Sequence, residues 1–98
     1  MNKTLKSISS KSNQSTNKVV RNINLIEAVN MALHRAMLED SSVVILGEDV
    51  AVNGGVFRAT DKLRTEFGLK RVMDTPLAET MIAGMSIGMA AQGLRPVA

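Results

Sequence analysis

The chain has 98 residues and a formal net charge of +3, a length that allows one small domain with a modest core. It contains no cysteine, which excludes a disulfide framework, a thiol nucleophile and cysteine-based zinc sites. The positive charge is concentrated in residues 1–20, which hold four lysines and no acid, whereas residues 21–98 hold eight basic and nine acidic residues. A nearly neutral folded part argues against a nucleic-acid partner.

Residues 1–20 are rich in serine and predict a disordered basic tail. This tail lacks the continuous apolar core of a secretory signal, and as a transit peptide it would be unusual because it has no arginine. The longest uncharged run, Thr80 to Leu94, is shorter than the roughly 20 residues of a membrane helix. We therefore expect a cytoplasmic protein with no membrane partner, the alternative being the mitochondrial matrix if residues 1–20 are a transit peptide.

The first predicted helix covers residues 24–40. Asn24 is a suitable N-cap, and Glu27 three residues later completes a capping-box pattern. Apolar side chains at helical spacing define one face: Leu25, Val29, Ala32, Leu33, Ala36 and Met37. His34 lies off this face, on the side of Glu27, and we expect it to be solvated and without a role.

A short apolar run at residues 43–46 predicts a strand that is covered on both faces, as in a parallel sheet. The loop "GEDVAVNGG" follows, and it matches neither the G-x-G-x-x-G nor the Gly-Lys-Ser/Thr phosphate-binding pattern. Residues 56–67 then predict a second helix, with Val56, Leu63 and Phe67 on one face and Gly68 at its end.

A second short strand at residues 71–74 leads into a third predicted helix that ends before Gly93. Thr75 is the expected N-cap of this helix, and Pro76 is expected at its first position. Small residues make the helix thin enough for another backbone to approach closely: Ala83, Gly84, Ser86, Gly88, Ala90 and Ala91.

The final stretch "LRPVA" predicts the start of a third strand with no turn to end it, so we expect a piece of a longer domain. Helices and strands alternate along the whole folded part. This order predicts the α/β fold class, with a parallel sheet and flanking helices.

Two glutamates are expected to meet at one edge of this sheet. Glu48 follows the first strand, and Glu79 lies in the first turn of the helix that follows the second strand. The carboxyl ends of parallel strands share an edge, and ligands of open α/β sheets bind there. Two acids at one cleft form a pattern that enzymes use.

Each glutamate also has a simpler interpretation. Glu48 is either a carboxylate facing a cleft or a solvated loop acid like Asp49 beside it. Glu79 is either a surface acid favoured by the helix dipole or a partly buried acid with a chemical role, since the next eleven residues carry no charge. Its spacing of four residues from Thr75 excludes a capping box.

The stretch "LGEDVAVNGGVFRATDKLRTEFGLKRVMDTPLAET" and the later "IGMAAQGLRPVA" resemble the beta chains of the thiamine-diphosphate-dependent decarboxylating component of 2-oxo acid dehydrogenase complexes. The bacterial pyruvate dehydrogenase type is nearest, and the branched-chain 2-oxo acid type comes second. The likeness covers residues 22–98. It implies that residues 21–98 are the N-terminal portion of a transketolase-like pyrimidine-binding domain, truncated within a strand.

The resemblance also implies roles for individual residues. Glu79 matches the glutamate that hydrogen-bonds a ring nitrogen of the cofactor's aminopyrimidine and so activates the cofactor. Glu48 matches a glutamate near the same site that helps to relay protons, and Leu77 matches a position that packs by the pyrimidine. The diphosphate and its magnesium are held by a separate alpha chain in this family, so no metal ligand is expected here.

The implied activity is the oxidative decarboxylation of pyruvate, with transfer of the acetyl group to a lipoyl carrier. The implied partners are the alpha chain, in a heterotetramer of two alpha and two beta chains, and the lipoyl acyltransferase core of the complex. As a partial half-site, the chain is expected to be inactive alone. The alternatives are a branched-chain 2-oxo acid dehydrogenase and a non-catalytic module that docks through its thin helix, although the docking module leaves Glu48 and Glu79 unexplained.

Overall fold

A three-stranded parallel sheet forms the centre of the structure. The computed structural model describes residues 20–98, so the predicted tail at residues 1–20 lies outside the described residues except for Val20. The strands lie in the order β2–β1–β3, and their bounds are Val43–Gly47 for β1, Val72–Asp74 for β2 and Arg95–Val97 for β3. Both neighbours of β1 run parallel to it. The predicted α/β class with a parallel sheet is confirmed.

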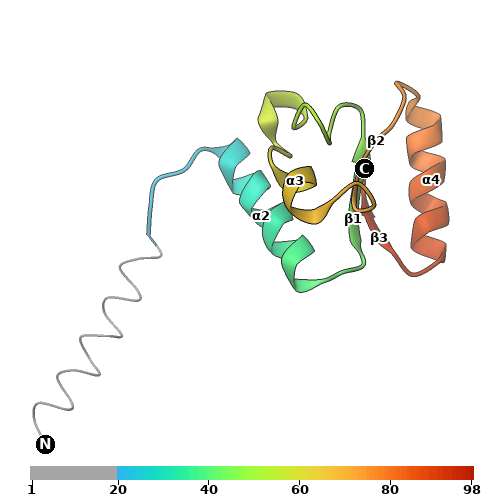
Figure 1. Cartoon of the computed structure of the whole chain (residues 1–98), viewed down its shortest axis with the longest axis horizontal. Helices are drawn as coiled ribbons and strands as arrows, with labels where there is room; N and C mark the ends of the chain where they lie inside the picture. The colour runs from blue at the N-terminus through green and yellow to red at the C-terminus, as the bar shows by residue number, and fades with distance from the viewer. Residues whose placement is uncertain (1–19) are drawn as a thin grey trace, which may run out of the picture.

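Helices cover both faces of this sheet (Figure 1). Helices α2 (Leu25–Glu39) and α3 (Leu63–Phe67) lie on one face, and α4 (Glu79–Ala91) lies on the other. The N-terminus of α2 has the predicted capping box, in which the Glu27 N–H donates to the Asn24 side chain at 2.8 Å and the Asn24 N–H donates to the Glu27 carboxylate at 3.3 Å.

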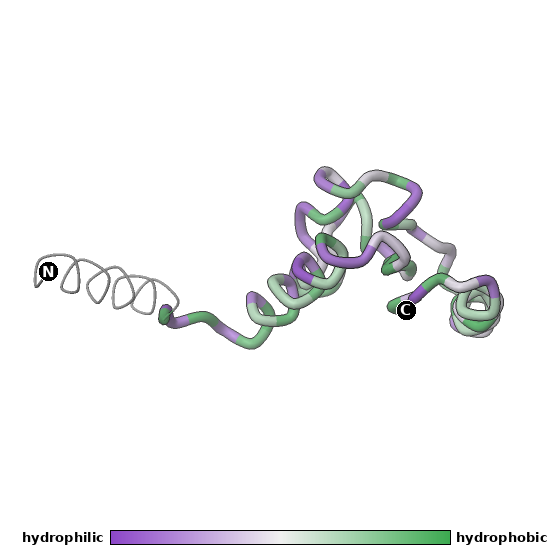
Figure 2. The backbone as a smooth tube through the Cα atoms, turned by 90° about the horizontal axis from the view of Figure 1, so that it is seen from below, coloured by the Kyte–Doolittle hydropathy of each residue, from purple (hydrophilic) through white to green (hydrophobic). Residues whose placement is uncertain are grey.

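Strand β1 is buried along its whole length, as its apolar run predicted. Its side chains alternate between the two faces. Val43 and Ile45 pack with Met37, Leu63 and Val72 in the core beneath α2 and α3. The opposite side of the sheet depends on a single helix, α4, and no residue of α4 is buried in the described chain. Figure 2 shows α4 nearly end-on and hydrophobic around most of its circumference.

The predicted face of α2 is only half correct. Met37 is buried, but Leu25 is 81 % exposed and Val29 is 42 % exposed. The helix reaches the sheet with its C-terminal half only, so its first turns extend past the described core.

The predicted helix over residues 56–67 is wrong. The segment forms a 3₁₀ turn at Val56–Arg58, and the helix α3 begins only at Leu63. Phe57, Arg58 and Lys62 have φ values of 52°, 61° and 65°, which lie in the left-handed region and interrupt an α-helix. Gly68 ends α3 as predicted, and its N–H donates to the Arg64 carbonyl at 2.8 Å.

Tertiary hydrogen bonds explain this interruption. The Asn30 side chain on α2 donates to the carbonyls of Ala59 and Asp61, at 3.0 and 3.1 Å. The Thr60 hydroxyl donates to the Val50 carbonyl at 2.7 Å, and the Thr60 N–H donates to the Gly54 carbonyl at 2.9 Å. These partners satisfy backbone groups that a continuous helix would have paired internally.

The helix after β2 also begins later than predicted, at Glu79 with Ala78 as its N-cap. The Thr75 N–H donates to the Gly47 carbonyl at 2.9 Å and so extends the pairing of β1 with β2. Thr75 also precedes a proline, which disfavours helical backbone. The Thr75 hydroxyl therefore does not cap the helix, and it donates to the Pro76 carbonyl at 3.1 Å.

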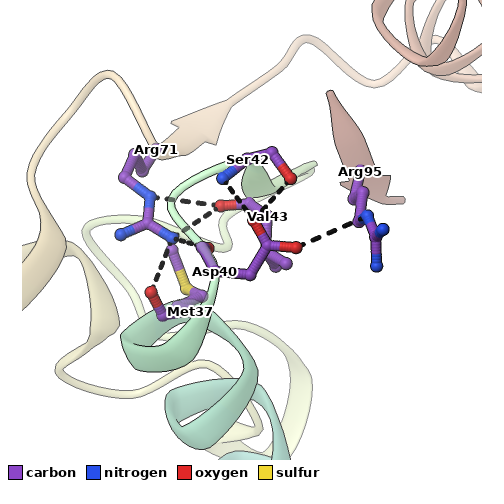
Figure 3. Close-up of polar contacts among 6 residues, drawn as sticks. All are labelled: Met37, Asp40, Ser42, Val43, Arg71 and Arg95. Carbon is purple, nitrogen blue, oxygen red and sulfur yellow. Dashed lines mark hydrogen bonds and ion pairs between the residues drawn. The ribbon is translucent and has the colours of Figure 1, made fainter. Parts of the chain in front are cut away.

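Arg71 joins three segments at the amino edge of the sheet (Figure 3). Its guanidinium donates to the backbone carbonyls of Met37, Asp40 and Val43 at 2.8 to 3.1 Å. It also lies over the Phe67 ring, 5.1 Å from the centroid. Arginine suits this position because its planar fork presents several donors in fixed directions. No local pattern in the sequence marks this residue.

Candidate functional site at the carboxyl edge of the sheet

Glu48 is positioned by the end of β1. On one side of it, the Gly47 carbonyl accepts the Thr75 N–H at 2.9 Å. On the other side, the Asp49 carbonyl accepts the Gly55 N–H at 2.7 Å. Glu48 itself is half-buried, whereas Asp49 is exposed, as expected for a solvated loop acid.

Glu79 reaches the same edge through β2. Gly47 and Asp74 are paired in register, so β1 and β2 end side by side. Five residues after Asp74, Glu79 is the first residue of α4. It is exposed in the described chain rather than partly buried as its apolar surroundings suggested, because no other described segment covers this turn of α4.

The structure brings the two glutamates together in one hollow of about 440 Å³. The other lining residues are apolar or small, and they come from β1, the loop after it, α4 and the end of the chain. The full lining comprises Leu46, Gly47, Glu48, Val50, Glu79, Ile82, Ala83 and Ala98. The prediction that both acids meet at the carboxyl edge of the sheet is therefore confirmed as geometry.

Leu77 lies outside this lining. It belongs to the connection between β2 and α4 and is 79 % exposed. Its contact with a pyrimidine therefore stays a prediction.

Ile82 and Ala83 are lining residues that were not among the predicted site residues. They follow Glu79 by three and four residues on α4, which is the spacing that puts helix side chains on one face. This spacing could have identified them once Glu79 was a candidate. The position of Val50 in the lining could not be predicted from residue spacing, because it depends on how the loop folds back.

The loop that carries Glu48 and Val50 is fixed by two side chains from outside it. The Asp74 carboxylate accepts the Ala51 N–H at 2.8 Å, and the Thr60 hydroxyl donates to the Val50 carbonyl. Thr60 is 7 % exposed and is buried tightly enough that a Cβ on Gly55 would lie 2.7 Å from its hydroxyl oxygen. Gly55 also has a φ of 75°, so this turn requires glycine for two reasons.

A larger hollow of about 490 Å³ lies between α2 and the segment 57–66. Its charged lining residues are of both signs, and four of its titratable side chains form two pairs. Arg58 lies 3.6 Å from Asp61, and the His34 Nε2 lies 2.6 Å from the Glu66 carboxylate. His34 was expected to be solvated, but it joins α2 to α3 and meets the Phe67 ring edge-on, with centroids 5.4 Å apart. The charges of this hollow are of opposite sign, whereas the hollow at the carboxyl edge is lined by two acids and no basic side chain, so we assign the site to the carboxyl edge.

Residues 20–98 contain no group of three or more histidine, aspartate or glutamate side chains arranged to hold a metal ion. Within the same residues, no helix has the length and apolar character needed to cross a membrane.

The hollow combines apolar side chains with two carboxylates. Leu46, Val50 and Ile82 offer apolar walls, and the two carboxylates offer hydrogen-bond partners at the rim. The model of the pyrimidine-binding domain of transketolase matches residues 21–98. The chain belongs to this family.

Several relatives of this pyrimidine-binding domain are known by name. The chain is 53 % identical over 73 residues to the pyruvate dehydrogenase E1 component subunit beta of Staphylococcus aureus strain Mu50, an alignment that covers 74 % of this chain and 22 % of the relative. It is 50 % identical over 76 residues to the subunit of that name from Acholeplasma laidlawii, covering 78 % of this chain and 23 % of the relative. The chain is 51 % identical over 78 residues to the subunit of that name from Leifsonia xyli subsp. xyli, and the alignment covers 80 % of this chain and 23 % of the relative.

The predicted resemblance to beta chains of this kind is confirmed by these relatives. The chain spans less than a quarter of their length. The pyrimidine-binding domain described here is thus one part of what those proteins contain.

Proposed function

We propose that this chain contributes the pyrimidine-binding half of a thiamine-diphosphate site in the beta subunit of a pyruvate dehydrogenase. One observation carries the proposal. Glu48 and Glu79 come from neighbouring strand ends and line a single hollow whose other walls are apolar or small. Membership of the pyrimidine-binding family and relatives named pyruvate dehydrogenase subunit beta support the same function.

In this proposal, the Glu79 carboxyl group shares a proton with a ring nitrogen of the aminopyrimidine. Glu79 begins α4, so the helix holds its backbone in a fixed position at the rim of the hollow. Ile82 and Ala83 follow on the same face of α4 and place apolar surface beside Glu79. Covered by the cofactor and the alpha chain in the assembled enzyme, the exposed Glu79 would make a stronger hydrogen bond than it would in water. When bound, thiamine diphosphate supplies the nucleophilic carbon that attacks the 2-oxo acid.

Glu48 is proposed as the second acid–base group at this edge. It lines the same hollow from the β1 side and is half-buried, so it can pass protons between the site and the solvent. Leu77 is proposed to contact the pyrimidine from the connection before α4. The diphosphate and magnesium are assigned to the alpha chain, as the resemblance implies.

The proposed partner surface is α4. It is apolar, none of its residues is buried among residues 20–98, and nothing in that part of the chain approaches within 4 Å of a Cβ placed on Gly84 or Gly88. We propose that the alpha chain packs here, in a heterotetramer of two alpha and two beta chains that delivers acetyl groups to a lipoyl acyltransferase core. The chain alone is expected to be inactive, and the proposed location is the cytoplasm.

Replacement of Glu79 tests the proposal. In the full-length beta chain assembled with its alpha chain, Glu79→Gln keeps the side-chain size but removes the titratable proton. Turnover of pyruvate should fall by a factor of about 100 to 10,000, the range for a positioned acid–base group. Glu39→Gln is the matched control, because Glu39 is an exposed acid at the far end of α2.

If the activity of Glu79→Gln stays within a few-fold of the control, Glu79 has no catalytic role. It is then a surface acid that interacts with the helix dipole and contributes under about 1 kcal/mol to stability. The same assembled enzyme can be assayed with branched-chain 2-oxo acids. Faster turnover of those substrates than of pyruvate would favour the branched-chain alternative.

A further inference from the structure

We propose that Asp74 is a positioning residue, whose carboxylate fixes the loop after β1 and thereby sets where Glu48 lies relative to Glu79. This inference rests on the proposed function, since it concerns the geometry of that site. Asp74 does not line the hollow. It acts through the backbone of the loop rather than on a ligand.

The contact between Asp74 and the loop is direct. The Ala51 N–H donates to Asp74 Oδ1 at 2.8 Å, and the Val52 N–H lies 3.5 Å from Asp74 Oδ2. The first distance is typical of a good hydrogen bond and the second is at the limit of one. The two loop amides thus meet one carboxylate, with the Ala51 contact dominant.

The Asp74 contact lies immediately next to a residue that lines the hollow. Val50 precedes Ala51, and its carbonyl accepts the hydroxyl of the buried Thr60 at 2.7 Å. Asp74 and Thr60 therefore hold the N–H and the carbonyl of one peptide group, the Val50–Ala51 amide, from two different segments of the chain. Glu48 lies two residues before Val50, so its backbone cannot shift without disturbing these bonds.

Asp74 also belongs to the segment that carries Glu79. It is the last residue of β2, it is paired in register with Gly47, and the next residue, Thr75, donates to the Gly47 carbonyl. The same short segment thus holds the loop on both sides of Glu48 and leads on to α4. A shift of about 1 Å between catalytic groups can lower a rate about 100-fold, so a tie between their two segments matters for the site.

The test uses the full-length beta chain assembled with its alpha chain. Asp74→Ala removes both acceptors, Asp74→Asn keeps one acceptor oxygen at the same reach, and Asp49→Asn removes a charge from the same loop as a matched control. Amide exchange of the peptide covering residues 48–55 is followed by mass spectrometry, and thiamine diphosphate affinity is measured by titration calorimetry.

For Asp74→Ala, loop exchange should accelerate about tenfold or more, as expected for loss of a hydrogen bond to a charged group. The dissociation constant for thiamine diphosphate should rise by about tenfold or more as the loop moves. Asp74→Asn should stay within about threefold of the unaltered enzyme in both measurements, and Asp49→Asn should match the unaltered enzyme.

Three results would overturn the inference: unchanged loop exchange in Asp74→Ala, faster exchange with unchanged cofactor affinity, or Asp74→Asn as damaging as Asp74→Ala. If Asp74→Ala does not assemble, Asp74→Glu decides, because it keeps the charge and lengthens the side chain by one methylene. A raised dissociation constant in Asp74→Glu supports positioning, and an unchanged one contradicts it.

Glu79→Gln measured in parallel separates the two proposals. If Glu79→Gln lowers turnover while Asp74→Ala has normal loop exchange and normal cofactor affinity, only the positioning role of Asp74 is removed. If Glu79→Gln turns over pyruvate at the normal rate, the proposed function itself is removed.

Discussion

At the scale of single residues, Asp40 shows how charge is used away from the site. Its carboxylate accepts hydrogen bonds from the Ser42 hydroxyl at 2.6 Å and the Ser42 N–H at 2.8 Å, and it lies 3.4 Å from Arg95 Nε. The pKa of Asp40 is lowered below its ordinary value of 3.8. The main causes are the hydrogen bonds from the Ser42 side chain and then from the Ser42 backbone, and the positive charges of Arg95 and Arg71 add to them.

This lowered pKa makes the contribution of Asp40 to stability depend on pH. Because the folded-state pKa is below the unfolded-state pKa, the stabilisation is fully present above about pH 4 and is lost as the pH falls through the folded-state pKa. Asp40→Asn should therefore lower the urea midpoint of the assembled enzyme at pH 7, and the difference should shrink below pH 4. Glu39→Gln is the control, and a difference that grows on acidification would contradict the assignment.

The residues that could be predicted from the sequence were those with a local signal. Asn24 and Glu27 formed the expected capping box, and the positions of Glu48 and Glu79 followed from where strands end. Arg71 and Asp74 had no such signal, since their partners lie more than 20 residues away in the sequence. Long-range hydrogen bonds of this kind can be found only in the folded chain.

At the scale of elements, local patterns predicted strands better than helix boundaries. The buried run of β1 and the short β2 and β3 were all placed correctly. The segment 56–67 has apolar residues at helical spacing, yet Asn30 and Thr60 take over its backbone pairing and hold it in turns. The start of α4 moved from Pro76 to Glu79 because Thr75 continues the ladder with β1. In both cases tertiary hydrogen bonds outweighed a local preference.

Helix α4 leads to a prediction about assembly. Gly84→Leu should leave the fold of the chain intact, because no described residue has an atom within 4 Å of a Cβ at this position and leucine favours a helix over glycine by about 0.5–1 kcal/mol. It should nevertheless weaken assembly with the alpha chain by about 1–3 kcal/mol or more, as expected for overpacking a close contact. Analytical ultracentrifugation of the mixed chains measures this change.

Thr65→Leu provides a matched control, since Thr65 is exposed on the short helix α3 on the opposite face of the sheet. Normal assembly of Gly84→Leu would show that α4 is not the partner surface. Weakened assembly of both variants would point to a general effect of an added leucine.

At the scale of the whole molecule, the described chain presents two unequal halves. The face under α2 and α3 has a packed core, with Met37, Leu63 and Val72 almost fully buried. The α4 face carries the hollow with Glu48 and Glu79 and no buried helix residue. This asymmetry is consistent with a domain that completes its site with other segments or chains, as the proposed function requires.

The central claim is that Glu79 activates a bound thiamine cofactor. The most direct measurement is the exchange of the cofactor's thiazolium proton with deuterium, in the full-length beta chain assembled with its alpha chain. Glu79→Gln should slow this exchange by a factor of about 100 to 10,000 relative to the unaltered enzyme, with little change in thermal stability, because no core volume is lost. Exchange at the normal rate in Glu79→Gln would contradict the claim.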